Sequence, residues 1–167
     1  ELETVSNFKV LGVTLSDDLS WNAHIDAITR KASKNVFLLS QFKKAGMAVK
    51  DLLVMYTTMV RSVIEYACPV WHTNLPDYLC DQLELLQKRA LKIIYNTEHY
   101  DEALKLANIP SLKDRRDTLC MKFFNRMCCP MDKLHHLIPP IRPSRGLRSE
   151  SKYSVPKCRT TDITRVS

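Results

Sequence analysis

The sequence predicts a mainly α-helical protein that opens with a short β-structure. Apolar residues recur at steps of three and four over several long stretches, which is the period of an amphipathic helix. Glycine occurs only three times in 167 residues, which is few for an all-β fold built on tight turns. Apolar residues make up 45% and charged residues 26%, which is ordinary for a globular protein, and the length suits one domain or one domain plus a tail.

The β-structure is expected at the N-terminus. Residues Val5–Leu15 alternate between apolar and polar types and are rich in β-branched side chains, which predicts a strand or a hairpin with a bulge near Gly12. Residues 16–20 follow as a turn, and Ser20 is expected to cap the next helix.

Three long helices should follow the hairpin. Their apolar stripes lie at Trp21–Ala45, at Leu52–Ala67 with Pro69 ending the helix, and from Asp77 to Ile94. Trp71 lies between the second and third stripes and is expected to fill the core.

Shorter helices are predicted after the third stripe. One spans Asp101–Ala107, and another spans Ser111–Cys128 with Ser111 and Asp114 placed as a capping box. The expected organisation is therefore a hairpin at 1–20, a helical bundle at 21–96, a helical extension at 97–138 and a tail at 139–167.

The positive charge is concentrated in the tail. The chain carries a net charge of +7 and has a pI of about 9.2, which favours a polyanionic partner such as nucleic acid. Residues 1–139 hold 18 basic against 16 acidic residues, whereas residues 140–167 hold seven against two. Because the tail is also rich in proline and serine and poor in apolar residues, it is expected to be a disordered basic tail.

Four ordered segments resemble motifs of the reverse transcriptases of LINE-type (non-LTR) retrotransposons. They are F-K-V-L-G-V (8–13) with L-S-W (19–21) and H-I (24–25), R-S-V-I-E-Y-A-C-P-V-W (61–71), L-E (83–84) with Q-K-R-A-L-K-I-I (87–94), and I-P-S-L (109–112) with R-R (115–116) and C-M-K-F-F (120–124). Together they cover roughly residues 5–125 at intervals similar to those of the family.

The resemblance implies an edge hairpin of the polymerase palm, a helical thumb and a C-terminal extension. It also implies partners, namely an RNA/DNA template–primer duplex and the upstream palm and fingers of the parent polymerase. A thumb holds its duplex through backbone phosphates, which basic side chains bind without reading sequence. The residues expected to do so are Arg30, Lys31, Lys34, Lys43, Lys44, Lys88, Arg89 and Lys92. Arg115 and Arg116 are weaker candidates, because Asp114 and Asp117 flank them and could pair with them.

No enzymatic activity is expected of this chain alone. The parent polymerases hold Mg²⁺ on adjacent carboxylates in an aromatic-x-Asp-Asp turn, because both oxygens of phosphoryl transfer need charge stabilisation. Asp17-Asp18 follows the L-G-V string and has no aromatic residue two places before it, so it does not match that motif. No cofactor of the chain's own is expected.

The sequence is also compatible with other functions. The chain could be a non-enzymatic nucleic-acid-binding module that uses its basic tail, or a transposon relic without function. His24 and Asp26 match the His-x-Asp start of a non-haem iron site, which makes an AlkB-type oxygenase-associated segment a remote alternative. Zinc is a further alternative, with Cys128, Cys129, His135, His136 and Cys158 as ligands, although their spacing does not form two close pairs.

The expected location is intracellular, in the nucleus or in a cytoplasmic ribonucleoprotein. Neither a signal segment nor an apolar run of about 18 residues is evident, so no membrane association is expected. The six cysteines show no regular spacing and are interpreted as small buried apolar side chains in a reducing compartment.

Overall fold

The computed structural model describes residues 5–73, 75–141 and 153. The chain divides into two compact units, Glu1–Phe123 and Phe124–Ser167. The predicted disordered tail lies almost entirely outside the described residues. Within the described part, no helix is long and apolar enough to cross a membrane.

The N-terminal hairpin is present and is tighter than expected. Strands β1 (Asn7–Val10) and β2 (Val13–Ser16) pair antiparallel, with Lys9 opposite Thr14. The two linking residues, Leu11 and Gly12, have φ values of 47° and 89°. Two positive φ values in a two-residue loop give the turn whose twist matches that of paired strands. The bulge predicted near Gly12 is therefore a tight turn.

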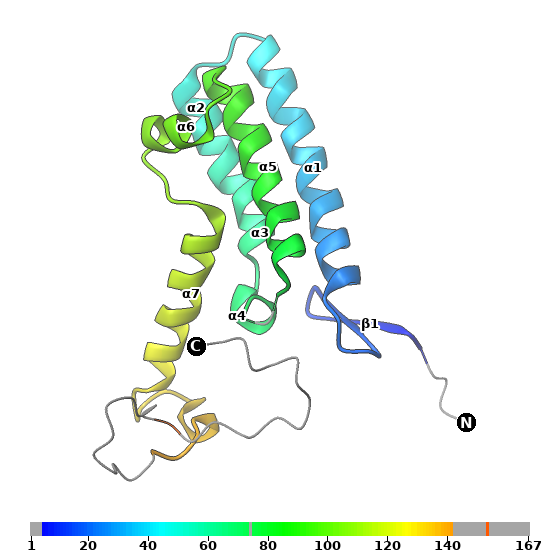
Figure 1. Ribbon diagram of the computed structural model, residues 1–167, viewed down its shortest axis with the longest axis vertical. Helices are drawn as coiled ribbons and strands as arrows, with labels where there is room; N and C mark the ends of the chain where they lie inside the picture. Colours follow the sequence, from blue (N-terminus) through cyan, green and yellow to red (C-terminus); the bar gives the residue numbers. More distant parts are fainter. Residues whose placement is uncertain (1–4, 74, 142–152, 154–167) are drawn as a thin grey trace. The chain divides into compact units, whose positions relative to one another are not determined.

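The three predicted long helices are confirmed (Figure 1). The first is α1 (Asn22–Lys44) and the third is α5 (Asp77–Tyr95). The second is a continuous helical run that consists of α2 (Val49–Met55), a π-helical segment η1 (Tyr56–Arg61) and α3 (Ser62–Glu65). The run stays unbroken because Tyr56 and Ser62 both keep right-handed helical dihedral angles. Figure 1 shows the three arranged alongside one another, with α1 and α5 pointing in the same direction.

The apolar stripes meet in one core inside the first unit. It is formed mainly by Ile25, Ala32, Leu39, Leu52, Tyr56, Ile64, Trp71, Leu83, Leu91, Ile94 and Leu112. These residues come from every helix of the bundle and from the first turn of the helix that starts at Leu112. At roughly 1.5–3 kcal/mol for each large side chain buried, this shared core is what holds the helices together.

Pro69 begins a helix instead of ending one, which corrects the prediction. The second helical run stops at Glu65, because Ala67 adopts a left-handed conformation with φ of 53°. Helix α4 (Cys68–Trp71) then starts with Pro69 in its first turn, where a missing N–H costs nothing. Trp71 is 1% exposed, and its Nε1 donates to the carbonyl of Tyr66 at 3.0 Å, which confirms its place in the core.

The start of α1 also differs from the prediction. The helix begins one residue after Trp21 and has no side-chain cap, so Ser20 is not its cap. Asp18 instead uses its Oδ1 to accept the backbone N–H of Ser20 at 2.9 Å, and Leu19 closes this turn with φ of 58°.

The shorter helices lie where the sequence predicts them. They are α6 (Tyr100–Ala107) and α7 (Leu112–Met127). The predicted capping box is present, since Asp114 N donates to Ser111 Oγ at 3.1 Å and Ser111 Oγ donates to Asp114 Oδ2 at 2.7 Å. In the second unit a 3₁₀ turn, η2, spans His135–Leu137, and the rings of Phe124 and Tyr153 meet edge to face.

Candidate functional site

The eight basic residues singled out by sequence fall into two groups on α1 and α5. Arg30, Lys31 and Lys34 lie in the middle turns of α1 and are called here the mid-helix group. The other five, called the helix-end group, lie in the last turns of the two helices; they are Lys43, Lys44, Lys88, Arg89 and Lys92. A hydrogen bond from Lys43 Nζ to the carbonyl of Ile94, at 3.0 Å, joins the two helix ends.

Most of these cations have no carboxylate partner within the described part of the chain. Only Lys92 makes an ion pair, with Glu98 at 2.7 Å. Arg30 Nε donates to the backbone carbonyl of Asp26 at 3.3 Å, and the Lys88 ammonium lies 5.2 Å from the centre of the Tyr100 ring. All eight are exposed except Lys43, which is half-buried.

Three members of the helix-end group share a small hollow. It has a volume of about 200 Å³, and Lys88, Arg89 and Lys92 line it together with Thr97 and Tyr100. The end of α5 is a favourable place for cations even without a ligand, because the carbonyls of the last turn carry partial negative charge. The position of these three cations therefore has a structural reason that is independent of any ligand.

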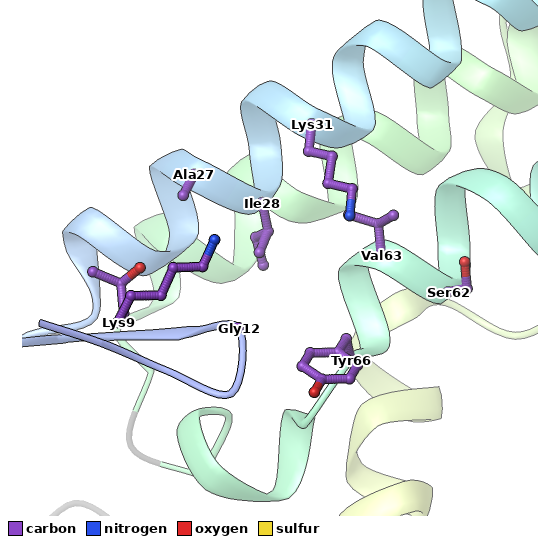
Figure 2. A pocket seen from close by; sticks show the side chains of 9 residues that line it. Lys9, Gly12, Ala27, Ile28, Lys31, Ser62, Val63 and Tyr66 are labelled. Carbon is purple, nitrogen blue, oxygen red and sulfur yellow. The ribbon is translucent and has the colours of Figure 1, made fainter.

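A second hollow contains a cation that the sequence reasoning missed. It has a volume of about 480 Å³ and lies between the hairpin, α1 and α3, where Lys9 faces it together with Lys31 (Figure 2). The alternation of the hairpin is the signal that could have found Lys9. Its cross-strand partner Thr14 lines the same hollow, so one face of the hairpin is polar and points there.

Tyr66 holds the hairpin against the end of α3. Its hydroxyl donates to the carbonyl of Leu11 at 2.8 Å, and its ring lies so close to Gly12 that a Cβ there would be 3.2 Å from Tyr66 Cε1. On the other side, Thr14 N donates to His24 Nδ1 at 3.3 Å. The hairpin is therefore fixed to the bundle from two sides.

The environment of His24 does not suit an iron ligand. The side chain is 1% exposed, lies edge-on to the rings of Trp21 and Trp71, and has its Nδ1 occupied by Thr14 N–H. Burial lowers the pKa of His24 below its usual value, so the ring is neutral near pH 7. Asp26 is exposed and accepts a hydrogen bond from Gln82 at 3.3 Å. Among the described residues no group of three metal-binding side chains occurs.

Three of the five zinc candidates have other partners, and a fourth, Cys129, is exposed. Cys128 Sγ lies 3.4 Å from the hydroxyl of Tyr153, His135 Nδ1 lies 3.0 Å from the carbonyl of Met127, and His136 Nδ1 lies 2.9 Å from the carbonyl of Lys133. Cys158 lies outside the described residues.

The Asp17-Asp18 pair shapes a turn. Asp17 Oδ1 accepts the N–H of Asp18 at 2.9 Å, and Asp18 accepts that of Ser20. The hydrogen bonds from Ser20 lower the pKa of Asp18, because they favour its charged form.

Glu84 and Gln87, both in the third motif, connect α5 to the helices that follow. Glu84 accepts the backbone N–H groups of Leu112 and Lys113 at 3.1 and 3.3 Å, and the hydroxyl of Tyr100 donates to it as well. Gln87 Nε2 donates to Tyr100 Oη at 2.7 Å. Sequence reasoning missed this network, because its partners lie up to 29 residues away.

The paired arginines of α7 bind residues of the bundle instead of the neighbouring aspartates, which corrects the expected pairing. Arg115 donates to Glu65, and Arg116 Nε donates to His72 Nδ1 at 3.3 Å. The flanking Asp117 accepts from His72 Nε2 at 3.0 Å. Arg116 is fully buried, and its two terminal nitrogens have no hydrogen-bond partner among the described residues. Arg116 is therefore not a surface cation, whereas the side chain of Arg115 remains partly exposed.

Comparison with known proteins places the chain beside a transposon polymerase. No protein-family profile matches it, and no solved structure matches it. Over 152 residues it is 22% identical to the probable RNA-directed DNA polymerase from transposon BS of Drosophila melanogaster, an alignment that covers 88% of this chain and 17% of that polymerase. The chain thus spans about a sixth of its relative's length, and it is distantly related to one segment of a transposon RNA-directed DNA polymerase.

Proposed function

We propose that this chain is the thumb and adjoining C-terminal region of a LINE-type reverse transcriptase and that it grips a template–primer duplex through backbone phosphates. The distant similarity to a transposon polymerase and the four motif segments support this assignment. The division into a palm-edge hairpin at 1–20, a thumb at 21–96, an extension at 97–138 and a tail at 139–167 belongs to the proposal.

One observation carries the proposed grip. Seven of the eight basic side chains on α1 and α5 have no carboxylate partner among the described residues, and Lys92 is the exception. Cations that serve only to solubilise a helix are often balanced by acidic residues one turn away. An unbalanced set along two parallel helices suits a row of phosphates, whose binding releases counterions and is therefore strongly dependent on salt.

The hairpin supplies the second part of the proposal, a contact with the upstream palm and fingers. Several of its apolar residues are not covered by the described part of the chain, since Phe8 is 62% exposed and Leu11 is 87% exposed. Val10 and Leu15 are also exposed. Phe8 and Leu15 are cross-strand partners, so their exposed side chains lie next to each other on one face of the hairpin, as at an interaction site. In the parent polymerase we place the palm sheet there.

Catalysis belongs to that upstream region in our proposal. The chain contributes no aromatic-x-Asp-Asp turn, and Asp18 is engaged with Ser20. Mg²⁺ would be held by the palm of the intact enzyme, and the working location would be the nucleus or a cytoplasmic ribonucleoprotein.

Binding of the full 167-residue chain to an RNA/DNA hybrid duplex across a salt series tests the grip. The test variant is the triple substitution K88Q/R89Q/K92Q. If each contacts a phosphate, the slope of log affinity against log salt should fall by about one per residue lost. The matched control removes the same charge at three exposed lysines outside the proposed surface, in the variant K50Q/K105Q/K122Q.

Three results would count against the proposal. Equal losses in the two triple variants would indicate a general charge effect. Loss of binding only on removal of residues 140–167 would favour a module that binds through its basic tail. Absence of binding at modest salt would favour a relic without function.

A further inference from the structure

We propose that the hollow between the hairpin, α1 and α3 is a binding site for a phosphate group, held by Lys9 and Lys31. With a nucleic-acid phosphate as its occupant, the site rests on the proposed function and extends it to the hairpin. With free phosphate as its occupant, it stands independently of that function.

The shape of the hollow is that of a ligand site. Its volume of about 480 Å³ lies within the range of roughly 300–1,000 Å³ that small-molecule pockets occupy. Three elements that are distant in sequence form its walls, and Figure 2 shows Lys9 and Lys31 reaching into the space between them from the hairpin and from α1. The two cations come from different elements, so they do not belong to a single helix face.

The charge of the hollow is unbalanced. No carboxylate is among its lining residues, and neither lysine makes an ion pair with a described residue. Two ammonium groups in one concavity repel each other, and the repulsion is stronger beside low-dielectric walls than in bulk water. A bound anion would remove this repulsion, which is the physical reason to expect one.

The hydrogen-bond donors that line the hollow favour an oxyanion as its ligand. The hydroxyl of Tyr66 already donates to Leu11, and that of Ser62 already donates to Thr58. Thr14 also lines the hollow, and its hydroxyl makes no hydrogen bond with the described part of the chain. The two ammonium groups and this hydroxyl are the donors that the hollow offers to the several acceptor oxygens of a phosphate. The apolar side chains of Ile28 and Val63 line the rest of the hollow, where a sugar carbon face could pack.

Gly12 keeps space open at the hairpin turn that borders the hollow. Gly12 lines the hollow with φ of 89°, and any side chain there would press on the neighbouring Tyr66 ring, which lines the hollow as well. Glycine at this place therefore keeps both the turn and the cavity.

The test is an NMR titration of the full chain with inorganic phosphate at low salt. We expect saturable shifts of the Lys9, Gly12, Thr14 and Lys31 amides. The variant K9Q/K31Q, which keeps most of each side-chain stem, should weaken phosphate binding by at least about tenfold, since each charge-assisted hydrogen bond contributes on that scale. The control K50Q/K105Q removes two exposed charges elsewhere and should change the affinity less than about twofold.

A second variant separates shape from charge. Ala27 is exposed on α1 and lines the hollow, so A27L should place an apolar side chain in it and weaken phosphate binding while leaving every charge in place. Ala45→Leu adds the same bulk at an exposed alanine that ends α1 outside the hollow, and it should have no effect. Non-saturable shifts spread over all basic residues, or equal weakening by the charge control, would overturn the proposal.

Competition identifies the source of the phosphate. If the occupant is a backbone phosphate, the hybrid duplex should displace inorganic phosphate, and A27L should weaken duplex binding. If phosphate binds and the duplex does not compete, the site takes free phosphate or a phosphomonoester, and the grip of the helix-end group is judged separately by its own salt series.

Discussion

Glu84 accepts the backbone N–H of Leu112 at 3.1 Å, so a carboxylate on α5 caps the first turn of α7 from 28 positions away. The free N–H groups at the start of a helix need acceptors, and negative charge there also interacts favourably with the helix dipole. A glutamate that looks like part of a basic surface motif is thus a tertiary cap.

Replacing Glu84 by glutamine should destabilise the fold by about 1 kcal/mol, because the amide can accept one N–H but carries no charge. Urea unfolding followed by circular dichroism measures this loss. Asp81→Asn, one turn earlier on the exposed side of α5, is the matched control and should change stability by less than about 0.5 kcal/mol. Equal effects of the two changes would refute the capping role.

Gly12→Ala should cost more than Gly46→Ala. Both glycines have positive φ, 89° and 85°, so alanine is strained by roughly 1–2 kcal/mol at each. Only at Gly12 would the new Cβ also meet a neighbour, the Tyr66 ring at 3.2 Å, whereas nothing lies within 4 Å at Gly46. The difference between the free energies of unfolding of the two variants, measured by urea unfolding, reports the contact with the Tyr66 ring. A larger loss of stability for Gly46→Ala than for Gly12→Ala would contradict this prediction.

Arg116→Met should leave the free energy of unfolding nearly unchanged or raise it. The guanidinium is fully buried with two nitrogens that lack acceptors in the described structure. Removing this incompletely paired buried charge recovers its desolvation cost, which offsets the loss of the hydrogen bond to His72. Arg115→Met should instead destabilise, because it leaves Glu65 with only the longer contact to Arg61 at 3.7 Å. Thermal unfolding of both variants is the measurement, and a large loss for Arg116→Met would show that its terminal nitrogens are satisfied.

Stability should fall on acidification from about pH 7 to about pH 5. Burial lowers the pKa values of His24 and His72 from 6.5, and for His72 the nearby Arg116 acts in the same direction. The unfolded chain therefore binds more protons in this window, so the free energy of unfolding rises with pH, by at most about 1.4 kcal/mol per pH unit for each histidine. This contribution is complete above about pH 6.5 and is lost as the pH falls towards the folded pKa values.

The midpoint of urea unfolding, measured at several pH values, tests this dependence. His24→Gln should flatten the curve, whereas His99→Gln, at an exposed position, should leave it unchanged. A pH dependence that survives both His24→Gln and His72→Gln would assign the effect to other groups.

The sequence by itself determined which stretches are helical and which residues face the core. The stripes of α1, α5 and α7 are local patterns, and burial of one apolar face at a fixed period is enough to define each helix within one or two residues. The capping box of α7 was equally readable, because Ser111 and Asp114 lie three residues apart. The eight basic residues were also identified from sequence, although their proposed role awaits the salt series.

Tertiary structure alone decided what the polar motif residues do. Whether Arg115 contacts its neighbour or Glu65, and whether Glu84 faces solvent or the start of α7, depends on how helices distant in sequence pack together. The same holds for Lys9, which joins Lys31 only because Tyr66 and His24 fix the hairpin to the bundle. Helical periods are set within a few residues, whereas hydrogen bonds and ion pairs are satisfied by whichever partner the fold brings within reach.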